Sequence, residues 1–412
     1  MSEALIRQVA ILVGGKGTRL GELTREVPKP LLPIANERAF LDYLIEMVAR
    51  HGYADIMLLA GHLADRVEEA YQGRRLGDAT IRVLREHEPL GTGGALTTAR
   101  DALDEQFILM NGDTLFDINL RALEASARGG QAVATIALRV ADDVSRYGRV
   151  LTDGARVTRF LEKDPGFHGP GTINGGVYVL KRTVLDLIDR LPCSIEQDIF
   201  PRLVECGMIR GEIFDGFFLD IGIPAALELG HRKLPKLRVR PAAFFDRDGV
   251  LNVDHGYTFR PGDLEFVPGA VEAVRRLNDR GYLVIVVSNQ AAIARGYCTI
   301  EDVNRFNRAM QEQLFSHGAH VDQFYVAPYH PEGKIAEYAI DHVDRKPGPG
   351  MLLRAFVDWP IDKERSFLIG DKETDIRAAE NAGIVGYLYA GGDLNDFVDN
   401  LLAKQVLTTI RA

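Results

Sequence analysis

The sequence predicts an α/β protein built from two doubly wound, three-layer domains. Short apolar runs alternate with segments of helical period from one end of the chain to the other, a pattern typical of α/β sheets. The chain has 412 residues, whereas a single hydrophobic core stops growing at roughly 250–300 residues. The alternation is interrupted once, at 234–241, and then starts again. We therefore expect one domain on each side of this interruption.

The first domain, residues 1–233, opens with a strand and a glycine-rich loop. Its strands are expected where short apolar runs end at turn residues, at 9–13, 56–60, 81–85, 107–110, 132–140 and 172–180, with a hairpin at 149–162. Its helices are expected where apolar residues recur with helical spacing, at 40–50, 64–71, 94–103 and 194–205.

The segment 234–241 reads L-P-K-L-R-V-R-P, and its two prolines and lack of a clear period indicate a linker. The second domain, residues 242–412, repeats the alternation of the first. Its strands are expected at 242–245, 283–288, 323–327 and 366–370. Its helices are expected at 270–280, 300–316, 351–357 and 374–382.

The composition is that of an ordinary globular protein, with 46% hydrophobic and 26% charged residues. The formal net charge of -9 argues against a nucleic-acid partner, for which a basic domain is expected. Cys193, Cys206 and Cys298 are too widely spaced for a disulfide framework or a C-x-x-C pair. The charged N-terminus does not read as a signal peptide, and no apolar run approaches the ~20 residues of a membrane span. We expect a cytoplasmic enzyme with no membrane partner; the sequence does not indicate its oligomeric state.

A glycine-rich loop, V-G-G-K-G-T-R-L, follows the first strand. Gly14, Gly15 and Gly17 would let backbone N–H groups approach a triphosphate without a Cβ in the way. Arg19 adds a planar fork for phosphate oxygens, and Lys29 adds a point charge. The pattern is neither the P-loop nor G-x-G-x-x-G. Taken alone, a glycine-rich turn after a strand is more often only a turn.

Two aspartates extend this prediction to a metal ion. Asp113 ends a buried strand, where open α/β sheets place their ligands. Asp113 and Asp220 could together hold Mg²⁺, which typically takes one or two carboxylates plus phosphates. Each aspartate alone could equally be a helix N-cap or a turn residue.

Seven short segments, taken in order, carry a resemblance to a known family. They read G-G-x-G-T-R-L, P-K-P, G-T-G-G, N-G-D, E-K, N-G-G-V-Y and D-I-G-x-P. This order resembles the sugar-1-phosphate nucleotidyltransferases over nearly all of residues 6–230. The resemblance implies residues for the triphosphate, the base, an Mg²⁺ pair, and the sugar with its phosphate. In that order they are Gly14, Gly15, Gly17, Thr18, Arg19 and Lys29; Glu88 and Gly91; Asp113 and Asp220; and Glu162, Lys163, Asn174 and Gly175.

The reaction implied by this resemblance is in-line attack of a sugar-1-phosphate oxygen on the α-phosphorus of a nucleoside triphosphate, with pyrophosphate leaving. The nucleophile is already ionised, so the site must position the reactants and neutralise charge, and it needs no general base. The wording N-G-D-T-L-F-D-I-N-L and S-R-Y-G-R-V is closest to the D-glycero-D-manno-heptose 1-phosphate guanylyltransferases. That subfamily implies GTP and a heptose 1-phosphate as substrates.

In the second domain, Asp246 and Asp248 lie two residues apart at a strand end, in F-F-D-R-D-G-V. Their like charges would repel, and a metal ion or a shared proton resolves the conflict. The segments S-N-Q, R-K-P and G-D-K-E-T-D follow in order. This order resembles the haloacid-dehalogenase-type phosphatases.

By that resemblance, Asp246 is the nucleophile that forms an aspartyl-phosphate, and Asp248 is the general acid and base. Asp371 would complete an Mg²⁺ site with Asp246 and the backbone carbonyl of Asp248. Ser288 and Lys346 would hold the transferring phosphoryl group. The substrate ligands implied are Ser288, Asn289 and Lys346.

The longer matches D-R-D-G-x-x-N-V-D-H-G-Y and S-N-Q-x-x-I-A-R-G narrow the resemblance. They resemble the D-glycero-D-manno-heptose 1,7-bisphosphate 7-phosphatases and, more loosely, the histidinol-phosphate phosphatases. Arg295 and Arg345 are then expected at the distal phosphate. Those families commonly carry a zinc site of Cys-x-His and Cys-x-Cys, and we expect this loop to fold without zinc because no thiolate remains. The corresponding positions hold Ala327, Tyr329, His342 and Asp344.

The two resemblances fit one pathway, because a 7-phosphatase would supply the heptose 1-phosphate that the first domain would activate. The product would be an NDP-heptose, a donor for cell-surface glycans such as lipopolysaccharide. One alternative is a mannose-1-phosphate or other hexose-1-phosphate nucleotidyltransferase joined to a histidinol-phosphate-like phosphatase. Another is a sugar-nucleotide-sensing domain that regulates a phosphatase. Loss of a catalytic residue would favour the sensor, and Arg19, Lys29, Asp113 and Asp220 are all present.

Overall fold

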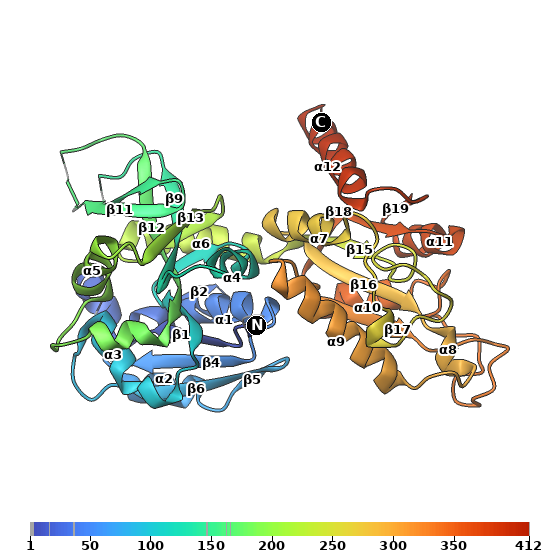
Figure 1. Cartoon of the computed structure of the whole chain (residues 1–412), viewed down its shortest axis with the longest axis horizontal. Helices are drawn as coiled ribbons and strands as arrows, with labels where there is room; N and C mark the ends of the chain where they lie inside the picture. The colour runs from blue at the N-terminus through green and yellow to red at the C-terminus, as the bar shows by residue number, and fades with distance from the viewer. Residues whose placement is uncertain are drawn as a thin grey trace. The chain divides into compact units, whose positions relative to one another are not determined.

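In the computed structural model, the chain forms two compact units, Met1–Lys236 and Leu237–Ala412 (Figure 1). The structure describes residues 4–15, 17–35, 38–145, 147–161, 163–164 and 166–411. Each unit is a sheet covered by helices, which confirms the predicted α/β class. Within the described ranges, every helix is too short or too polar to cross a bilayer.

A ten-stranded sheet forms the frame of the first unit. β1 (Gln8–Leu12) pairs in parallel with β4 and β7, whereas β12 pairs antiparallel with β7 and β9. Strands near the centre are covered on both faces, which explains their continuous apolar runs. Across the sheet the strands are β10 (Arg149–Asp153), β11 (Arg156–Leu161), β13 (Ile209–Ile213), β9 (Ala134–Ala141), β12 (Gly171–Lys181), β7 (Gln106–Asn111), β1, β4 (Asp55–Ala60), β6 (Ala79–Arg85) and β5 (Arg75–Leu76).

The helices of the first unit bury one face each. In α1, Phe40, Leu44 and Val48 recur every four residues and are fully buried. The Asp42 carboxylate accepts a hydrogen bond from the Ala39 N–H (3.0 Å), which caps the first turn. The helices are α1 (Phe40–Arg50), α2 (Ala64–Tyr71), α3 (Gly91–Thr98), α4 (Leu120–Ala127), α5 (Phe200–Glu205) and α6 (Pro224–Arg238).

In this unit, one predicted helix differs from the structure, and the structure contains strands that the sequence pattern did not indicate. The helix expected at 194–205 begins as a π-helical turn, η5 (Ile195–Ile199), before α5. Pro201 explains this break, because it has no N–H with which to continue the α-helical ladder. Two short strands that we did not predict, β8 (Thr114–Asp117) and β14 (Phe217–Asp220), pair antiparallel and lie beside the predicted metal ligands.

The segment 234–241 is not the irregular linker that we predicted. α6 runs through Pro235 to Arg238, and strand β15 starts at Arg240. Leu234 is fully buried, and it lies two helical turns after Leu227, which is also buried. This apolar face holds the segment in the helix, although Pro235 removes one backbone hydrogen bond.

A parallel five-stranded sheet forms the frame of the second unit. Its strands, in order across the sheet, are β17 (Gln323–Ala327), β16 (Leu283–Asn289), β15 (Arg240–Phe245), β18 (Ile361–Gly370) and β19 (Val385–Leu388). Its helices are α7 (Ala270–Asp279), α8 (Ala291–Ala294), α9 (Ile300–Ser316), α10 (Gly350–Asp358), α11 (Glu373–Ala382) and α12 (Leu394–Arg411).

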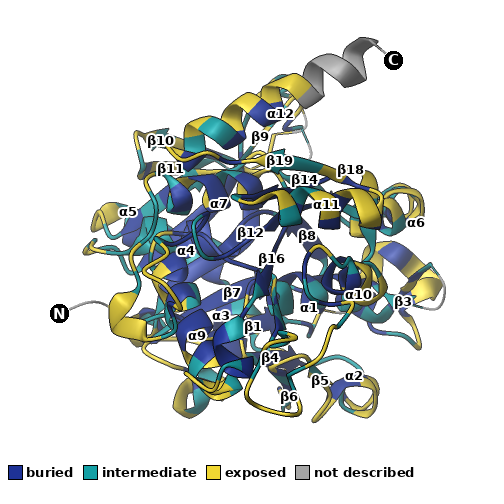
Figure 2. Ribbon diagram, turned by 90° about the vertical axis from the view of Figure 1, so that its right-hand side faces the viewer, coloured by how far each residue is buried: buried dark blue, intermediate teal, exposed yellow. Residues whose placement is uncertain are grey.

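The second sheet has a hydrophobic cluster on each face. Ala243 and Phe245 of β15 belong to the cluster that includes residues of α7, α9 and α12. Ala242 and Phe244 belong to the other cluster, with residues of α10 and α11. Because successive strand residues point to opposite faces, this division shows three layers, with buried strands between the helices (Figure 2).

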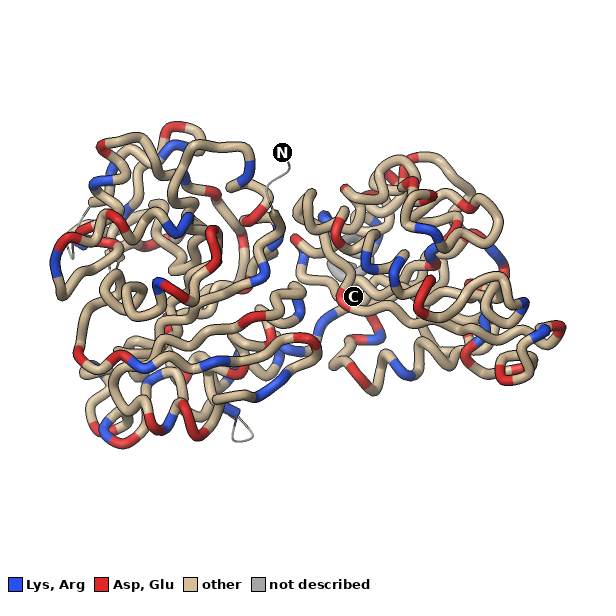
Figure 3. The backbone as a smooth tube through the Cα atoms, turned by 60° about the horizontal axis from the view of Figure 1, so that its bottom comes forward, with Lys and Arg blue, Asp and Glu red and all other residues tan. Residues whose placement is uncertain are grey.

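Charged residues of both signs are interspersed along both units (Figure 3), in keeping with the modest net charge of -9. A nucleic-acid-binding surface would instead show Lys and Arg residues clustered on one face. Local clusters of charged side chains are therefore the candidates for functional sites.

Candidate active sites

The first unit gathers its polar loops at one edge of the sheet. β1, β4, β6 and β7 are neighbouring parallel strands, so their carboxyl ends share this edge. The glycine-rich loop follows β1, Gly61 follows β4, and Asp113 follows β7. The predicted triphosphate and metal residues therefore lie at the place where such sheets bind ligands.

Two glycines of the loop lie where the Cβ of any other residue would be too close to neighbouring atoms. Gly17 has φ +61°, and a Cβ there would lie 2.9 Å from the Thr24 side chain. A Cβ on Gly14 would lie 3.0 Å from a Glu86 oxygen and 3.1 Å from the Gly61 nitrogen. Gly15 is exposed, as are Thr18 and Arg19 in the following 3₁₀ turn, η1 (Thr18–Thr24).

Lys29 joins the two predicted metal ligands. Its Nζ lies 2.6 Å from Asp113 Oδ2 and 3.6 Å from Asp220 Oδ1, and the lysine is only 5% exposed. The pairing of β8 with β14 sets Asp220 opposite Thr114, next to Asp113. A Cβ on Gly222 would lie 3.1 Å from Arg19 Nη2, so the glycine lets the guanidinium approach Asp220. The two carboxylates, Asp113 and Asp220, are the kind of donors that Mg²⁺ takes beside phosphates, so they fit that metal.

The buried carboxylate beside the loop is Glu86, which we did not predict. It is 9% exposed, and its Oε1 accepts a hydrogen bond from the Leu90 N–H (2.6 Å). Burial raises the pKa of Glu86 above its usual range, and the Leu90 N–H works in the opposite direction. Glu88, the residue that we expected to contact the base, is exposed. In the sequence, Glu86 could have been recognised only as a glutamate directly after a predicted strand, at the edge of the sheet that carries the glycine-rich loop.

The predicted sugar residues have different surroundings. Asn174 Nδ2 donates to the Tyr178 hydroxyl (2.9 Å), which in turn donates to Glu196 Oε1 (3.3 Å). A Cβ on Gly175 would lie 2.4 Å from the Phe116 ring, so glycine is required there. A Cβ on Gly91 would lie 2.4 Å from the Cys193 carbonyl oxygen, which also requires glycine. Lys163 is exposed, and Glu162 lies outside the described residues.

In the second unit, the predicted catalytic residues meet at the carboxyl ends of β15, β16 and β18. Asp246 follows β15 and is 7% exposed, and Lys346 is 4% exposed. Lys346 Nζ lies 2.9 Å from Asp246 Oδ1 and 2.6 Å from Asp375 Oδ1. Burial raises the pKa of Asp246 to about 6, although Lys346 lowers it.

A cluster of three carboxylates fits a divalent cation. Ligand oxygens of Asp246, Asp371 and Asp375 lie within 4.8 Å of one another. Asp371 Oδ1 is buried and, within the described part of the chain, has no hydrogen-bond partner. Gly249 has φ +88°, and a Cβ there would lie 2.6 Å from Asp371 Oδ2. These oxygens suit Mg²⁺, as predicted for Asp246 and Asp371.

Asp375 is a further site residue that we did not predict. It is 1% exposed, and it accepts a hydrogen bond from the Lys372 N–H (3.0 Å) at the start of α11. Its other oxygen contacts Lys346. Asp375 therefore holds the lysine against Asp246. The sequence indicated this residue only as the last aspartate of G-D-K-E-T-D, one helical turn after Asp371.

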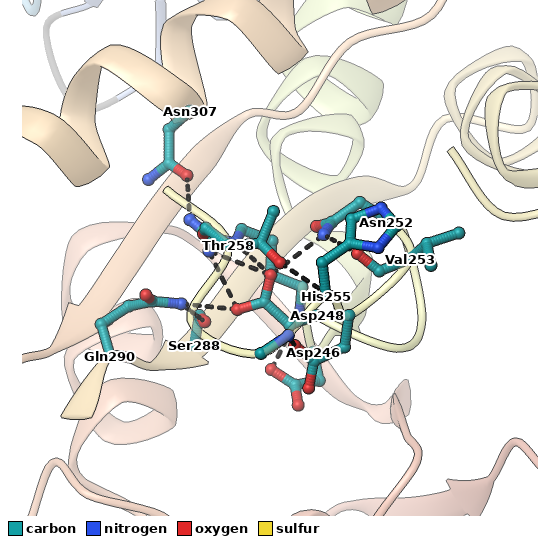
Figure 4. Close-up of polar contacts among 12 residues, drawn as sticks. Asp246, Asp248, Asn252, Val253, His255, Thr258, Ser288, Gln290 and Asn307 are labelled. Carbon is teal, nitrogen blue, oxygen red and sulfur yellow. Dashed lines mark hydrogen bonds and ion pairs between the residues drawn. The ribbon is translucent and has the colours of Figure 1, made fainter. Parts of the chain in front are cut away.

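Asp248, the predicted acid and base, is surrounded by hydrogen-bond donors (Figure 4). Asn252 Nδ2 donates to Oδ1 (3.0 Å) and Gln290 Nε2 donates to Oδ2 (2.8 Å). The same Gln290 amide donates to the Ser288 hydroxyl (2.8 Å). Asn289 exchanges two 3.0 Å hydrogen bonds with the backbone of Lys346, so its amide holds that residue in place.

Of the predicted distal-phosphate arginines, Arg295 contacts His330 and Arg345 contacts the neighbouring Tyr329. Arg295 Nη2 is 3.4 Å from His330 Nε2, and Arg345 Nη1 donates to the Tyr329 carbonyl oxygen (3.1 Å). Burial lowers the pKa of His330, and the two arginines lower it further. Burial and the charge of Arg295 also lower the pKa of Arg345, and two guanidinium groups that repel each other in this way favour an anion.

The loop in which related families carry zinc is packed differently here. The Tyr329 ring stacks on His342, with 3.9 Å between ring centroids. Asp344 is 7% exposed, and it pairs with Arg354 at 3.1 Å. Tetrahedral zinc takes thiolates and free imidazoles, so these residues do not fit it.

Family models match both units. The model described as Nucleotidyl transferase matches residues 8–236, more than half of the chain. A model described as HAD-hydrolase-like matches residues 343–402.

Curated relatives divide in the same way. The chain is 38% identical over 221 residues to D-glycero-alpha-D-manno-heptose 1-phosphate guanylyltransferase of Aneurinibacillus thermoaerophilus, covering 53% of this chain and 94% of that one. It is 42% identical over 165 residues to D-glycero-beta-D-manno-heptose-1,7-bisphosphate 7-phosphatase of Rhodopseudomonas palustris, covering 40% of this chain and 92% of that one.

Among solved structures, the crystal structure of HddC from Yersinia pseudotuberculosis complexed with GMP-PN matches with a TM-score of 0.50 and 30% identity. It covers 56% of this chain and 100% of that one.

Proposed function

Because the chain belongs to the nucleotidyl transferase family and, in its second unit, to the HAD-like heptose bisphosphate phosphatases, we propose that it catalyses two successive steps of NDP-heptose synthesis. The second unit would remove the 7-phosphate of D-glycero-D-manno-heptose 1,7-bisphosphate. The first unit would transfer GMP from GTP to the resulting heptose 1-phosphate. One observation carries the proposal: the relatives of the two units are both named for D-glycero-D-manno-heptose phosphates, the phosphatase for the β anomer and the guanylyltransferase for the α anomer.

In the transferase reaction, an oxygen of the sugar 1-phosphate attacks the α-phosphorus, and the bond to the pyrophosphate oxygen breaks. The loop backbone around Gly14 and Gly15 would bind the triphosphate, and Arg19 would neutralise developing charge. Lys29, which contacts both Asp113 and Asp220, would also neutralise this charge. Asp113 and Asp220 would hold Mg²⁺, which would supply further positive charge for the phosphates.

Glu86 supports guanine as the base. Guanine presents two neighbouring donors, N1–H and the 2-amino group, on one edge, and a carboxylate can accept both. Uracil, thymine and adenine do not present such a pair. Since Oε1 of Glu86 is already bonded to the Leu90 N–H, its second lone pair and Oε2 are the acceptors that remain.

In the phosphatase reaction, a carboxylate oxygen of Asp246 attacks the 7-phosphorus, and the bond to the sugar oxygen breaks. Asp248 would give its proton to that leaving oxygen. Water would then attack the phosphorus of the aspartyl-phosphate, with Asp248 taking the proton back. Lys346 and the Ser288 hydroxyl would hold the phosphoryl oxygens. Bound Mg²⁺ would offset the repulsion between the carboxylate and the phosphate.

Arg295 and Arg345 support a bisphosphate as the substrate. Arg295 lies beside His330, and the charges of both arginines lower the pKa of that histidine. A second phosphate bound there would hold the sugar while the first is removed. Monophosphates would lack this contact and should bind more weakly.

A substrate panel with the complete chain tests the proposal. GTP, UTP, dTTP and ATP are each combined with heptose 1-phosphate and with mannose 1-phosphate, and pyrophosphate is measured. Phosphate release is measured from the heptose bisphosphate, its monophosphates and histidinol phosphate. We expect the heptose and GTP to be preferred. Preference for mannose 1-phosphate or histidinol phosphate would assign the chain to another sugar or pathway.

A further inference from the structure

Arg247 lies between the two aspartates of D-R-D and has no assigned role in the proposed phosphatase reaction. Its side chain is fully buried, with 0% exposed. A buried guanidinium is costly unless it is paired and hydrogen-bonded. The partners of Arg247 should therefore reveal what the charge is used for.

The carboxylate that Arg247 contacts is that of Asp248. Nε donates to Oδ1 (3.1 Å), and Nη2 donates to Oδ1 (3.0 Å) and Oδ2 (2.9 Å). The planar guanidinium thus holds both carboxylate oxygens, which fixes the plane of the carboxylate as well as its position.

The opposite side of the guanidinium is anchored to the fold. Nη1 donates to Asn307 Oδ1 (3.1 Å) on α9, and Nη2 donates to the Thr258 carbonyl oxygen. The guanidinium carbon lies 4.5 Å from the centroid of the Phe306 ring. Figure 4 shows Gln290 and Ser288 on one side of Asp248 and Asn252 on the other.

We propose that Arg247 is a positioning residue that holds the carboxyl group of Asp248 in line with the leaving oxygen of the phosphate ester. The inference rests on the proposed phosphatase reaction, but it does not depend on which sugar is the substrate. Gln290 extends the arrangement, because it connects Asp248 to Ser288 at the phosphoryl site. A role confined to folding would not require both oxygens of the acid to be held.

Two substrates with different leaving groups distinguish a positioning role of Arg247 from a role in folding alone. An alkoxide leaving from a sugar needs a proton from Asp248, whereas p-nitrophenolate leaves readily without one. General acid catalysis contributes about 10²–10⁴-fold. Arg247→Met should therefore lower kcat/KM for a sugar phosphate by about 100-fold, and should change kcat/KM for p-nitrophenyl phosphate only a few fold.

The second half of the reaction gives an independent signal. Asp248 must also orient water against the aspartyl-phosphate, so Arg247→Met should show a burst of p-nitrophenol and accumulate phosphoenzyme. Arg247→Lys keeps the charge but loses the fork, and it should fall between wild type and Arg247→Met. Arg308→Met, a change at an exposed residue next to Asn307 on α9, is the matched control.

Equal losses for the sugar phosphate and p-nitrophenyl phosphate, or no loss for either, would overturn the proposal. If Arg247→Met does not fold, Asn307→Leu removes one partner of Arg247 without touching Asp248. It should show the same difference between the two substrates at a smaller size, and equal losses there would also overturn the proposal. Failure of wild type to hydrolyse the heptose bisphosphate would instead contradict the proposed substrate. The comparison is then made with the sugar phosphate that the enzyme does hydrolyse.

Discussion

Lys346→Met removes the buried cation of the phosphatase site and keeps much of the side-chain volume. The Lys346 side chain is 3% exposed, and its two partners, Asp246 and Asp375, are 9% and 1% exposed. Breaking a buried ion pair from one side costs about 3–5 kcal/mol, because the remaining charges stay buried. For a unit of this size, about 1 kcal/mol shifts the melting temperature by roughly 2–4 °C. We therefore expect a decrease of roughly 6–20 °C.

Lys372→Met is the matched control for stability. Lys372 Nζ also contacts a carboxylate of the site, Asp371, at 3.4 Å, but its side chain is 59% exposed. An exposed pair contributes only about 0–1 kcal/mol. Trp359, the only tryptophan in the chain, follows α10, so its fluorescence follows unfolding of the second unit alone.

The destabilisation caused by Lys346→Met should depend on pH, and the pKa of Asp246 gives the direction. In the folded protein, burial raises the pKa of Asp246 to about 6, above its ordinary value. Its contribution to stability is therefore complete below the ordinary pKa and is lost as the pH rises through about 6. Lys346 lowers this pKa, so removing it should destabilise the unit most above pH ~6 and less in acid. Without Mg²⁺, equal melting temperatures for wild type and Lys346→Met at pH 8 would refute the reasoning.

Three further changes test the rest of the account. Asp113→Ala should reduce nucleotidyl transfer by at least about 100-fold and leave phosphate release nearly unchanged; comparable loss of both activities in a folded protein would contradict separate sites. Glu86→Gln should lower kcat/KM for GTP by about 10-fold or more while UTP changes little, because the amide cannot accept both guanine donors; equal changes for both nucleotides would exclude Glu86 from base recognition. Phosphatase activity should survive zinc removal when Mg²⁺ is restored, because the residues of the loop that holds Tyr329 and His342 do not fit tetrahedral zinc; stoichiometric zinc in active protein would contradict this.

Much of the fold follows from local pattern, because strands buried on both faces read as short apolar runs. The strands that carry Asp113, Asp246 and Ser288 were predicted within a few residues of their observed ends. The segment 234–241 was misjudged, because its two prolines outweighed the apolar face of Leu227 and Leu234 that holds it in α6. The turn of η5 was also missed, since it depends on the ladder broken at Pro201.

Some site residues that lie far apart in the sequence come together in the structure. Lys29, which the resemblance assigned to the triphosphate, contacts Asp113 and Asp220, which it assigned to Mg²⁺. Glu86 and Asp375 were missed because their roles depend on burial, which composition and spacing do not report.

The most direct test of the two-step account is a single reaction followed by ³¹P NMR. The chain is mixed with D-glycero-D-manno-heptose 1,7-bisphosphate, GTP and Mg²⁺, and the same mixture is made with Asp246→Asn. Wild type should release orthophosphate first and then form pyrophosphate and GDP-heptose. Asp246→Asn should form none of these until heptose 1-phosphate is added, after which pyrophosphate and GDP-heptose should appear. GDP-heptose formed by Asp246→Asn from the bisphosphate alone, or a bisphosphate left intact by wild type, would contradict the account.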